Sequence, residues 1–322
     1  MTIVRTLQAY AGIVLLASST LVFSADQQAA GGAAAGVAAP NANRAAVAGS
    51  NAALPWPEPD AQAVATMTAE LQRDLSSAFQ ISRVGPWIVA TDLDAVSAKR
   101  FVQSTLAIYG AAIQQQLFTK KALSEPVKVY LFKDKDSYEL WNKKLFGKLP
   151  STPYGFYSRT SRALVMNIGT GGGTLLHEMV HAMAEADFPE IPAWLNEGIG
   201  SLFEASGPGA RGRVQGLTNW RLPGLQRAIR ERNQPLFQKL LSMDDDEFYG
   251  ANSGLNYAAA RYLMMFLQQH GKLETFYTRV RDKSDPSPQD TLRFCFDNKL
   301  TLKEIETNCY NWVRTLTFGT GQ

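Results

Sequence analysis

Residues 174–204 constrain the fold most, because they place two of the chain's three histidines four positions apart. At about 100° per residue, the apolar side chains of residues 175–183 occupy one face of a helix. His177 and His181 then project side by side from another face, about 6 Å apart along the axis, with Glu178 to one side. Because imidazoles at this spacing can reach one metal ion, the sequence predicts a metal-binding helix anchored by its apolar face.

Four acidic residues downstream are candidates for a third ligand. Glu185 lies on the same face, but a further turn along a straight helix places it too far from both histidines. Asp187 requires the chain to reverse directly after the helix, yet Ala184, a strong helix former, stands where such a turn uses glycine. Glu190 lies between prolines, in a connection that we expect on the surface.

Glu197 is the candidate that we favour. Prolines end the first helix, and Pro192 can begin a second one. Glu197 shares a face of that second helix with Gly200 and Ser201, whose small side chains allow a close approach to the first helix. We therefore expect Glu197 to be the third ligand, with Glu204 as a supporting group one or two turns further on.

The blocks His177-Glu178-x-x-His181 and Pro192-Ala-Trp-Leu-Asn-Glu-Gly198 resemble those of the gluzincin zinc metallopeptidases. More narrowly, they are similar to the bacterial peptidase-MA-like domain of unknown function found in exported proteins, over roughly residues 87–317. The resemblance implies that the two histidines and Glu197 bind Zn²⁺. It also implies that Glu178 is the general base for a zinc-activated water, and that peptide bonds are hydrolysed.

Gluzincins also use a downstream Tyr or His to stabilise the tetrahedral oxyanion. Tyr257, at the start of an expected helix, lies where such a donor is found, and packing within the helical lobe is its alternative role. His270 precedes Gly271 at an expected helix C-terminus, where the helix dipole stabilises a cation. Tyr257 is therefore the candidate oxyanion donor.

An exported zinc metallopeptidase acting on peptide or protein substrates is thus the function that we expect. Two alternatives remain open: a cell-wall amidase using the same zinc centre on peptidoglycan stem peptides, and a non-catalytic zinc-binding envelope scaffold or binding module. The presence of Glu178 argues for catalysis, because binding the metal does not require it. The net charge of +3 does not indicate a nucleic-acid partner. The arginines between Arg211 and Arg232 fit a solvated helix face or a surface that binds acidic groups.

Residues 1–24 predict a cleavable secretory signal peptide, with Arg5 as the only charge and an apolar run from Ala11 to Phe23. That run is shorter than the roughly 20 residues of a membrane-spanning helix, although an uncleaved anchor is the alternative. The Ala/Gly-rich residues 25–54 predict a disordered linker, and residues 55–322 a single peptidase domain. We therefore expect a periplasmic or secreted bacterial protein without a stable membrane span.

The remaining pattern predicts an α+β fold, with a small mixed β-sheet lobe followed by a mainly helical lobe. The resemblance implies a zincin-like arrangement, with the zinc helix at the cleft between them. Cys295 and Cys309 are expected to form a disulfide between two helices, the second begun by a capping box at Thr301 and Glu304; two unbridged buried thiols are the alternative. The expected strands are 87–90, 127–132, 155–158 and 163–167, and the expected early helices are 95–118 and 137–146.

Overall fold

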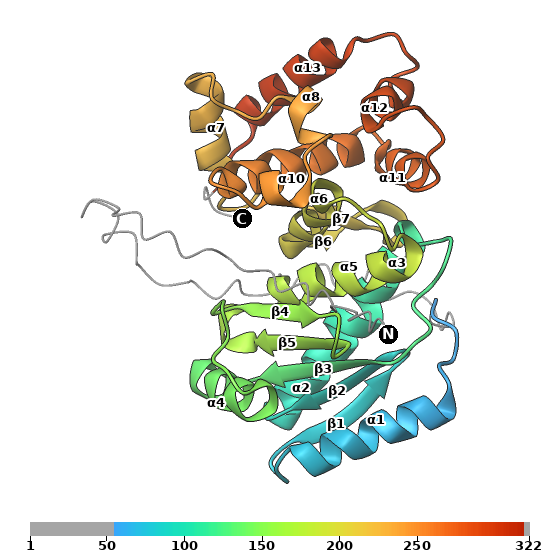
Figure 1. The fold of residues 1–322 in the computed structure, drawn as a ribbon, viewed down its shortest axis with the longest axis vertical. Helices are drawn as coiled ribbons and strands as arrows, with labels where there is room; N and C mark the ends of the chain where they lie inside the picture. Colours follow the sequence, from blue (N-terminus) through green and yellow to red (C-terminus); the bar gives the residue numbers. More distant parts are fainter. Residues whose placement is uncertain (1–54, 319–322) are drawn as a thin grey trace, which may run out of the picture. The chain divides into compact units, whose positions relative to one another are not determined.

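The computed structural model describes residues 55–318, so the predicted signal peptide and linker lie outside the described residues. The described chain is α+β, with a five-stranded mixed sheet in its N-terminal part and mainly helices in its C-terminal part (Figure 1). The predicted fold class is confirmed at this level. Among residues 55–318, no helix combines the length and the apolar character needed to cross a membrane.

The sheet has the order β1-β2-β3-β5-β4. Its central strands β2, β3 and β5 are parallel, while β1 and β4 pair antiparallel at the two edges. The central strands are almost continuous apolar runs, because helices cover both faces of the sheet. The strands are β1 Gln80–Val84, β2 Trp87–Thr91, β3 Val127–Phe132, β4 Gly155–Ser158 and β5 Ala163–Asn167.

Alternate residues of the strands pack into two separate hydrophobic clusters. On one face, side chains such as Tyr130 and Val165 meet the helices α1 (Ala61–Asp74) and α4 (Lys135–Phe146). On the other face, residues such as Val129 and Leu164 belong to the larger cluster, which includes the helix that carries His177 and His181. The four predicted strands are therefore confirmed, whereas β1 and α1 were not predicted.

Two segments differ from the expected elements. The expected helix 95–118 is divided into α2 (Ala95–Arg100), a π-helical segment η3 (Phe101–Gly110) and α3 (Ala111–Gln116). The segment 206–216, where no strand was expected, contains a short hairpin of β6 (Ser206–Pro208) and β7 (Val214–Gly216), with a 3₁₀ turn, η5 (Ala210–Gly212), between the strands.

Helix α6 (Ala193–Glu204) lies at the centre of the helical part, with every residue from Ala193 to Phe203 buried. It packs against α5 (Gly173–Asp187) on one side and against α10 (Ser253–Gln269) on another, and Figure 1 shows α5 between the sheet and α6. The remaining elements are η4 Ile168–Thr170, α7 Leu222–Arg230, α8 Phe237–Leu240, α9 Asp245–Phe248, α11 Leu273–Arg281, α12 Pro288–Cys295 and α13 Leu302–Thr315.

The predicted disulfide is not present: Cys295 and Cys309 are both free and buried. The capping box of Thr301 and Glu304 does begin α13, and α12 packs against α13 as expected. The two thiols nevertheless have different neighbours. The Cys309 sulfur lies 4.0 Å from the carbonyl oxygen of Tyr262 in α10. Burial raises the pKa of the Cys295 thiol to about 11. Nearby positive charges, which do not belong to α13, partly oppose this rise.

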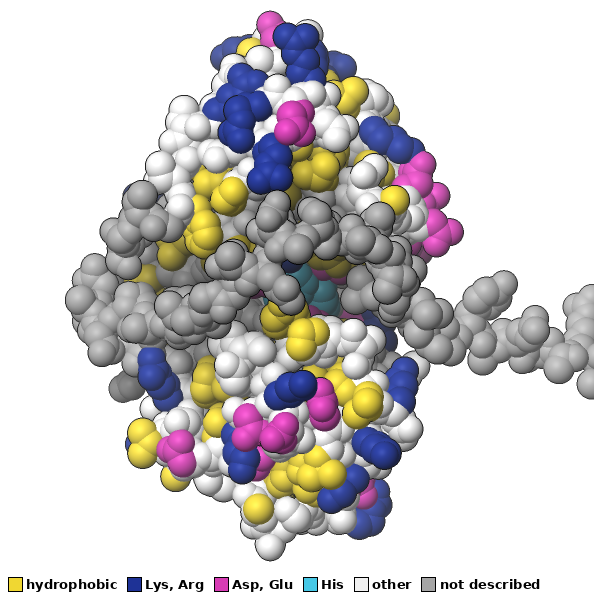
Figure 2. Space-filling view, turned by 90° about the vertical axis from the view of Figure 1, so that its left-hand side faces the viewer, with side chains coloured by type: hydrophobic (Ala, Val, Ile, Leu, Met, Phe, Trp, Pro, Cys, Tyr) yellow, Lys and Arg dark blue, Asp and Glu magenta, His cyan; other side chains and the backbone are white. Residues whose placement is uncertain are grey.

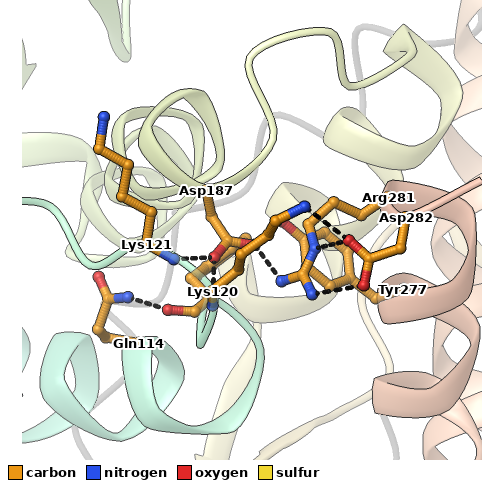
Figure 3. Close-up of polar contacts among 8 residues, drawn as sticks. Gln114, Lys120, Lys121, Asp187, Tyr277, Arg281 and Asp282 are labelled. Carbon is orange, nitrogen blue, oxygen red and sulfur yellow. Dashed lines mark hydrogen bonds and ion pairs between the residues drawn. The ribbon is translucent and has the colours of Figure 1, made fainter.

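Asp187 fixes the C-terminal end of α5 (Figure 3). Its Oδ1 accepts hydrogen bonds from the backbone N–H groups of Lys120 and Lys121, at 2.7 and 2.8 Å. Its Oδ2 accepts hydrogen bonds from the Tyr277 hydroxyl and the Arg281 guanidinium, at 2.9 and 2.8 Å. Because this carboxylate is fully buried and both oxygens are satisfied, Asp187 joins α5 to α11 and to the segment after α3.

We expect Asp187→Ala to lower the free energy of unfolding by about 3 kcal/mol, because it leaves several buried donors without their acceptor. Urea denaturation of the mature chain measures the change. Glu190→Ala is the matched control, since the Glu190 side chain is 80% exposed and forms an exposed ion pair with Lys283 at 3.4 Å. Equal stability of the two variants would contradict the structural role assigned to Asp187.

Candidate metal centre

The three side chains expected as metal ligands meet between α5 and α6. His177 Nε2 lies 3.0 Å from Glu197 Oε2, and His181 Nε2 lies 3.6 Å from the same oxygen. The three ligand atoms all lie within 4.8 Å of one another, and 13% or less of each side chain is exposed. Two imidazole nitrogens and one carboxylate oxygen at these distances could hold a metal ion.

Glycine allows the two helices to approach closely enough for this geometry. A Cβ atom at Gly200 would lie 3.1 Å from the imidazole of His177, which is tighter than ordinary van der Waals contact. A Cβ atom at Gly173 would lie 2.2 Å from the backbone oxygen of Glu204. The expected close approach is therefore confirmed, and Gly200 lets the His177 ring lie directly against the backbone of α6.

Two further side chains orient the expected ligands. Asn196 Oδ1 lies 2.9 Å from His181 Nδ1, so that Nδ1–H donates to the amide oxygen and the ring is oriented with Nε2 toward Glu197. The Tyr249 hydroxyl donates to Glu197 Oε1 at 2.8 Å, which leaves Oε2 for the imidazoles. Sequence reasoning missed both roles. Asn196 adjoins the expected ligand and could have been found, whereas no local pattern marks Tyr249.

The electrostatics couple His177 and Glu197 strongly. Burial alone would lower the pKa of His177, but the hydrogen bond and the negative charge of Glu197 outweigh it and raise that pKa to about 9. Burial alone would raise the pKa of Glu197, but the two imidazoles and the Tyr249 hydroxyl lower it to about 2. Without a metal, His177 therefore carries a proton at neutral pH, and a metal cation has to displace it.

Glu178 lies beside this group but is not one of its three members. Burial raises the pKa of its carboxyl group, the imidazoles partly oppose the rise, and the negative charge of Glu197 adds to it. The carboxylate also accepts a hydrogen bond from the backbone N–H of Tyr157 in β4. Glu178 therefore connects the metal-binding helix with the edge of the sheet.

Tyr257 lies at the same site, on the first turn of α10. Its ring packs against those of Phe248 and Tyr249, with centroid distances of 5.2 and 6.3 Å. Burial raises the pKa of its hydroxyl, and the charge of Glu197 raises it further. The structure therefore brings Tyr257 next to the expected ligands. This position is compatible with either of its two expected roles, oxyanion donor or packing residue.

Glu204 supports the site through charge, as the sequence predicts. Its Oε2 forms an ion pair of 2.7 Å with Arg221, and its negative charge contributes to the raised pKa of His177. Arg221 in turn lies over the Tyr257 ring, with its guanidinium carbon 5.6 Å from the ring centroid. Among the arginines of residues 211–232, Arg221 therefore lines the site.

The other candidate residues lie outside the ligand group. Asp187 is saturated by the donors described above, and Glu190 is exposed. Glu185 lies 3.8 Å from Arg159. His270 caps the end of α10, where its ring nitrogen Nδ1 bonds the carbonyl oxygen of Phe266 at 2.8 Å. Among these four, the predicted role of His270 at a helix C-terminus is confirmed.

Solvent can reach imidazole at the surface of the protein. Histidine side chains are visible in the middle of Figure 2, between the part that carries the sheet and the helical part. His181 is the more accessible of the two ligands, with 13% of its side chain exposed. A ligand could therefore approach the group from this side.

Neither models of known protein families nor curated proteins give a match to this sequence. Any functional assignment therefore depends on the geometry described above.

We expect Tyr249→Phe to weaken metal binding by about 10- to 100-fold, because removal of the hydroxyl frees the Glu197 carboxylate to rotate. Titration with Co²⁺, followed by its visible absorption, measures both the affinity and the ligand environment. Glu197→Ala should weaken binding further, since it removes a ligand. Tyr154→Phe is the control, because Tyr154 is 55% exposed and not part of the ligand group. Undiminished binding by Glu197→Ala would exclude the three-residue site.

Proposed function

We propose that this protein is a zinc-dependent metallopeptidase with a zincin-like fold, exported as its predicted signal peptide implies. The observation that carries the proposal is the convergence of His177, His181 and Glu197, with a fourth residue, Glu178, beside them. Two imidazoles and one carboxylate are typical of catalytic zinc sites, whereas structural sites usually have four ligands rich in cysteine. Neither cysteine belongs to this group, so the donor set fits Zn²⁺ in a catalytic role.

The surrounding residues can perform the steps that amide hydrolysis requires. When bound, zinc would make water more acidic and polarise the substrate carbonyl. Glu178 accepts the proton of the attacking water and then donates it to the leaving amine. Tyr257 donates a hydrogen bond to the developing oxyanion; its raised pKa keeps the hydroxyl protonated at neutral pH. Asn196 and Tyr249 keep the ligand side chains in place.

The edge strand β4 supports an extended peptide as the substrate. Strand β5 is paired on both sides, whereas β4 lies at the end of the sheet and is paired only with β5. The Asn167 N–H donates to the Tyr154 oxygen at 2.8 Å, and by alternation the polar backbone groups of Gly155 and Tyr157 point away from β5. The Tyr157 N–H already donates to Glu178, so an added peptide would pair with the other backbone groups of this edge and would lie beside the general base.

We expect Glu178→Gln to retain zinc and the fold but to lose peptide hydrolysis by at least about 10²- to 10⁴-fold, because the amide cannot accept the proton of water. Digestion of an unbiased peptide library by the mature protein measures the loss, and elemental analysis measures zinc. Equal cleavage by the variant and the wild type would exclude this mechanism. Cleavage of peptidoglycan stem peptides alone would identify an amidase, and a zinc-loaded wild type inactive on both substrates would indicate a binding module.

Tyr257→Phe tests the oxyanion donor separately. We expect kcat to fall about 10- to 1,000-fold, because the hydroxyl acts on the transition state. Zinc content is measured in parallel, because the Tyr257 hydroxyl also hydrogen-bonds Glu197. Steady-state kinetics on one peptide from the library measures the change, with Tyr154→Phe again as the control. Unchanged kcat in Tyr257→Phe would leave this residue with a packing role only.

A further inference from the structure

Trp220 differs from the other tryptophans of this chain in its exposure. The sequence has six tryptophans, and 55% of Trp220 is exposed. Trp56, Trp87, Trp141 and Trp194 are buried, and Trp312 is half-buried. A singly exposed apolar side chain needs no special explanation, so the significance of Trp220 depends on what surrounds its ring.

Arg221 holds the Trp220 ring beside the proposed active site. Its guanidinium carbon lies 4.6 Å from the Trp220 ring centroid and 5.6 Å from the Tyr257 ring centroid. The same guanidinium forms the ion pair with Glu204, and only 19% of the Arg221 side chain is exposed. One well-anchored cation thus contacts both an exposed aromatic ring and a ring of the site.

Two further exposed apolar side chains come from the segment of Trp220 and from the segment that is hydrogen-bonded to it. Leu217 and Phe318 are 43% and 47% exposed, and a hydrogen bond of 2.9 Å from the Thr218 hydroxyl to the Thr317 oxygen joins their two segments. We call Leu217, Trp220 and Phe318 the Trp220 patch. An aromatic ring with apolar neighbours favours an aliphatic or aromatic side chain over a sugar, whose hydroxyl groups need polar partners.

We propose that the Trp220 patch is a substrate subsite that binds an apolar side chain of the peptide, within a few residues of the cleaved bond. The inference rests on the proposed peptidase function and adds a substrate class to it. An extended peptide held by β4 on the sheet side would place one apolar side chain against Trp220 on the helical side. The subsite contributes binding energy away from the reacting atoms, so its loss raises KM more than it lowers kcat.

The test compares Trp220→Ala with the wild type on the same unbiased peptide library. The wild type should favour peptides with Leu, Phe or Met at one position near the cleaved bond. In Trp220→Ala, kcat/KM for these peptides should fall about 10- to 100-fold, mainly through KM, with little change for peptides that have Ser or Gly there. Trp220→Phe should keep most of the preference. Leu236→Ala is the control, because Leu236 is equally exposed at 50% but lies outside the patch.

Three outcomes would overturn the subsite. The first is an unchanged preference in Trp220→Ala, and the second is an equal loss on all peptides. The third is a Trp220-dependent preference for glycan-bearing muropeptides over free peptides. If the wild type cleaves nothing, the peptidase proposal fails by itself. Binding of fluorescent Leu- and Ser-containing library peptides to zinc-loaded Glu178→Gln then decides the subsite, since equal affinities with and without Trp220 would exclude it.

Discussion

The contact between the imidazole of His177 and the backbone of α6 is the constraint on which the site depends. Metal ligands from two helices can share one ion only when the helix axes come unusually close, and a side chain at Gly200 would separate them. The same closeness desolvates the ligands, and their mutual interactions then have to replace water. Glu197 meets this requirement, because both its oxygens have partners: the imidazoles at Oε2 and Tyr249 at Oε1.

Contacts at both ends of α5, and the packing of α5 against the sheet, fix the position of this helix. Asp187 ties its C-terminal end to α11 and to the segment after α3, while Gly173 brings its N-terminal end against the last turn of α6. The sheet supports the helix along its length. The expected metal ligands and the proposed general base Glu178 therefore lie on two closely packed helices, α5 and α6. The other groups proposed to act on substrate come from neighbouring segments: β4, the start of α10 and the loop before α7. This is the division expected when a fixed scaffold presents a site to variable loops.

The sequence was sufficient to predict that His177, His181 and Glu197 come together, because its signals are local. The spacing of His177 and His181, the proline break and the small residues beside Glu197 all lie within one stretch of two helices. Tyr249 and Asp187 could not be assigned in the same way, since their roles depend on partners that folding brings from distant segments. The cysteine prediction failed for a related reason: a pair of adjacent helices was correctly expected, but the direction in which each thiol faces was not.

Helix α6 has glycine on two faces. A Cβ atom at Gly198 would come within 3.2 Å of the Ala260 backbone in α10, just as one at Gly200 would press on His177. Around the axis of α6, Glu197 lies between the face of Gly198 and the face of Gly200. A larger residue at either glycine would therefore displace Glu197, the expected ligand. Very few amino-acid substitutions within α6 are therefore compatible with its packing, whether they arise in evolution or by protein engineering. The loop that carries Trp220 and the turn after β4 have exposed side chains, so substitutions there leave the group of His177, His181 and Glu197 undisturbed.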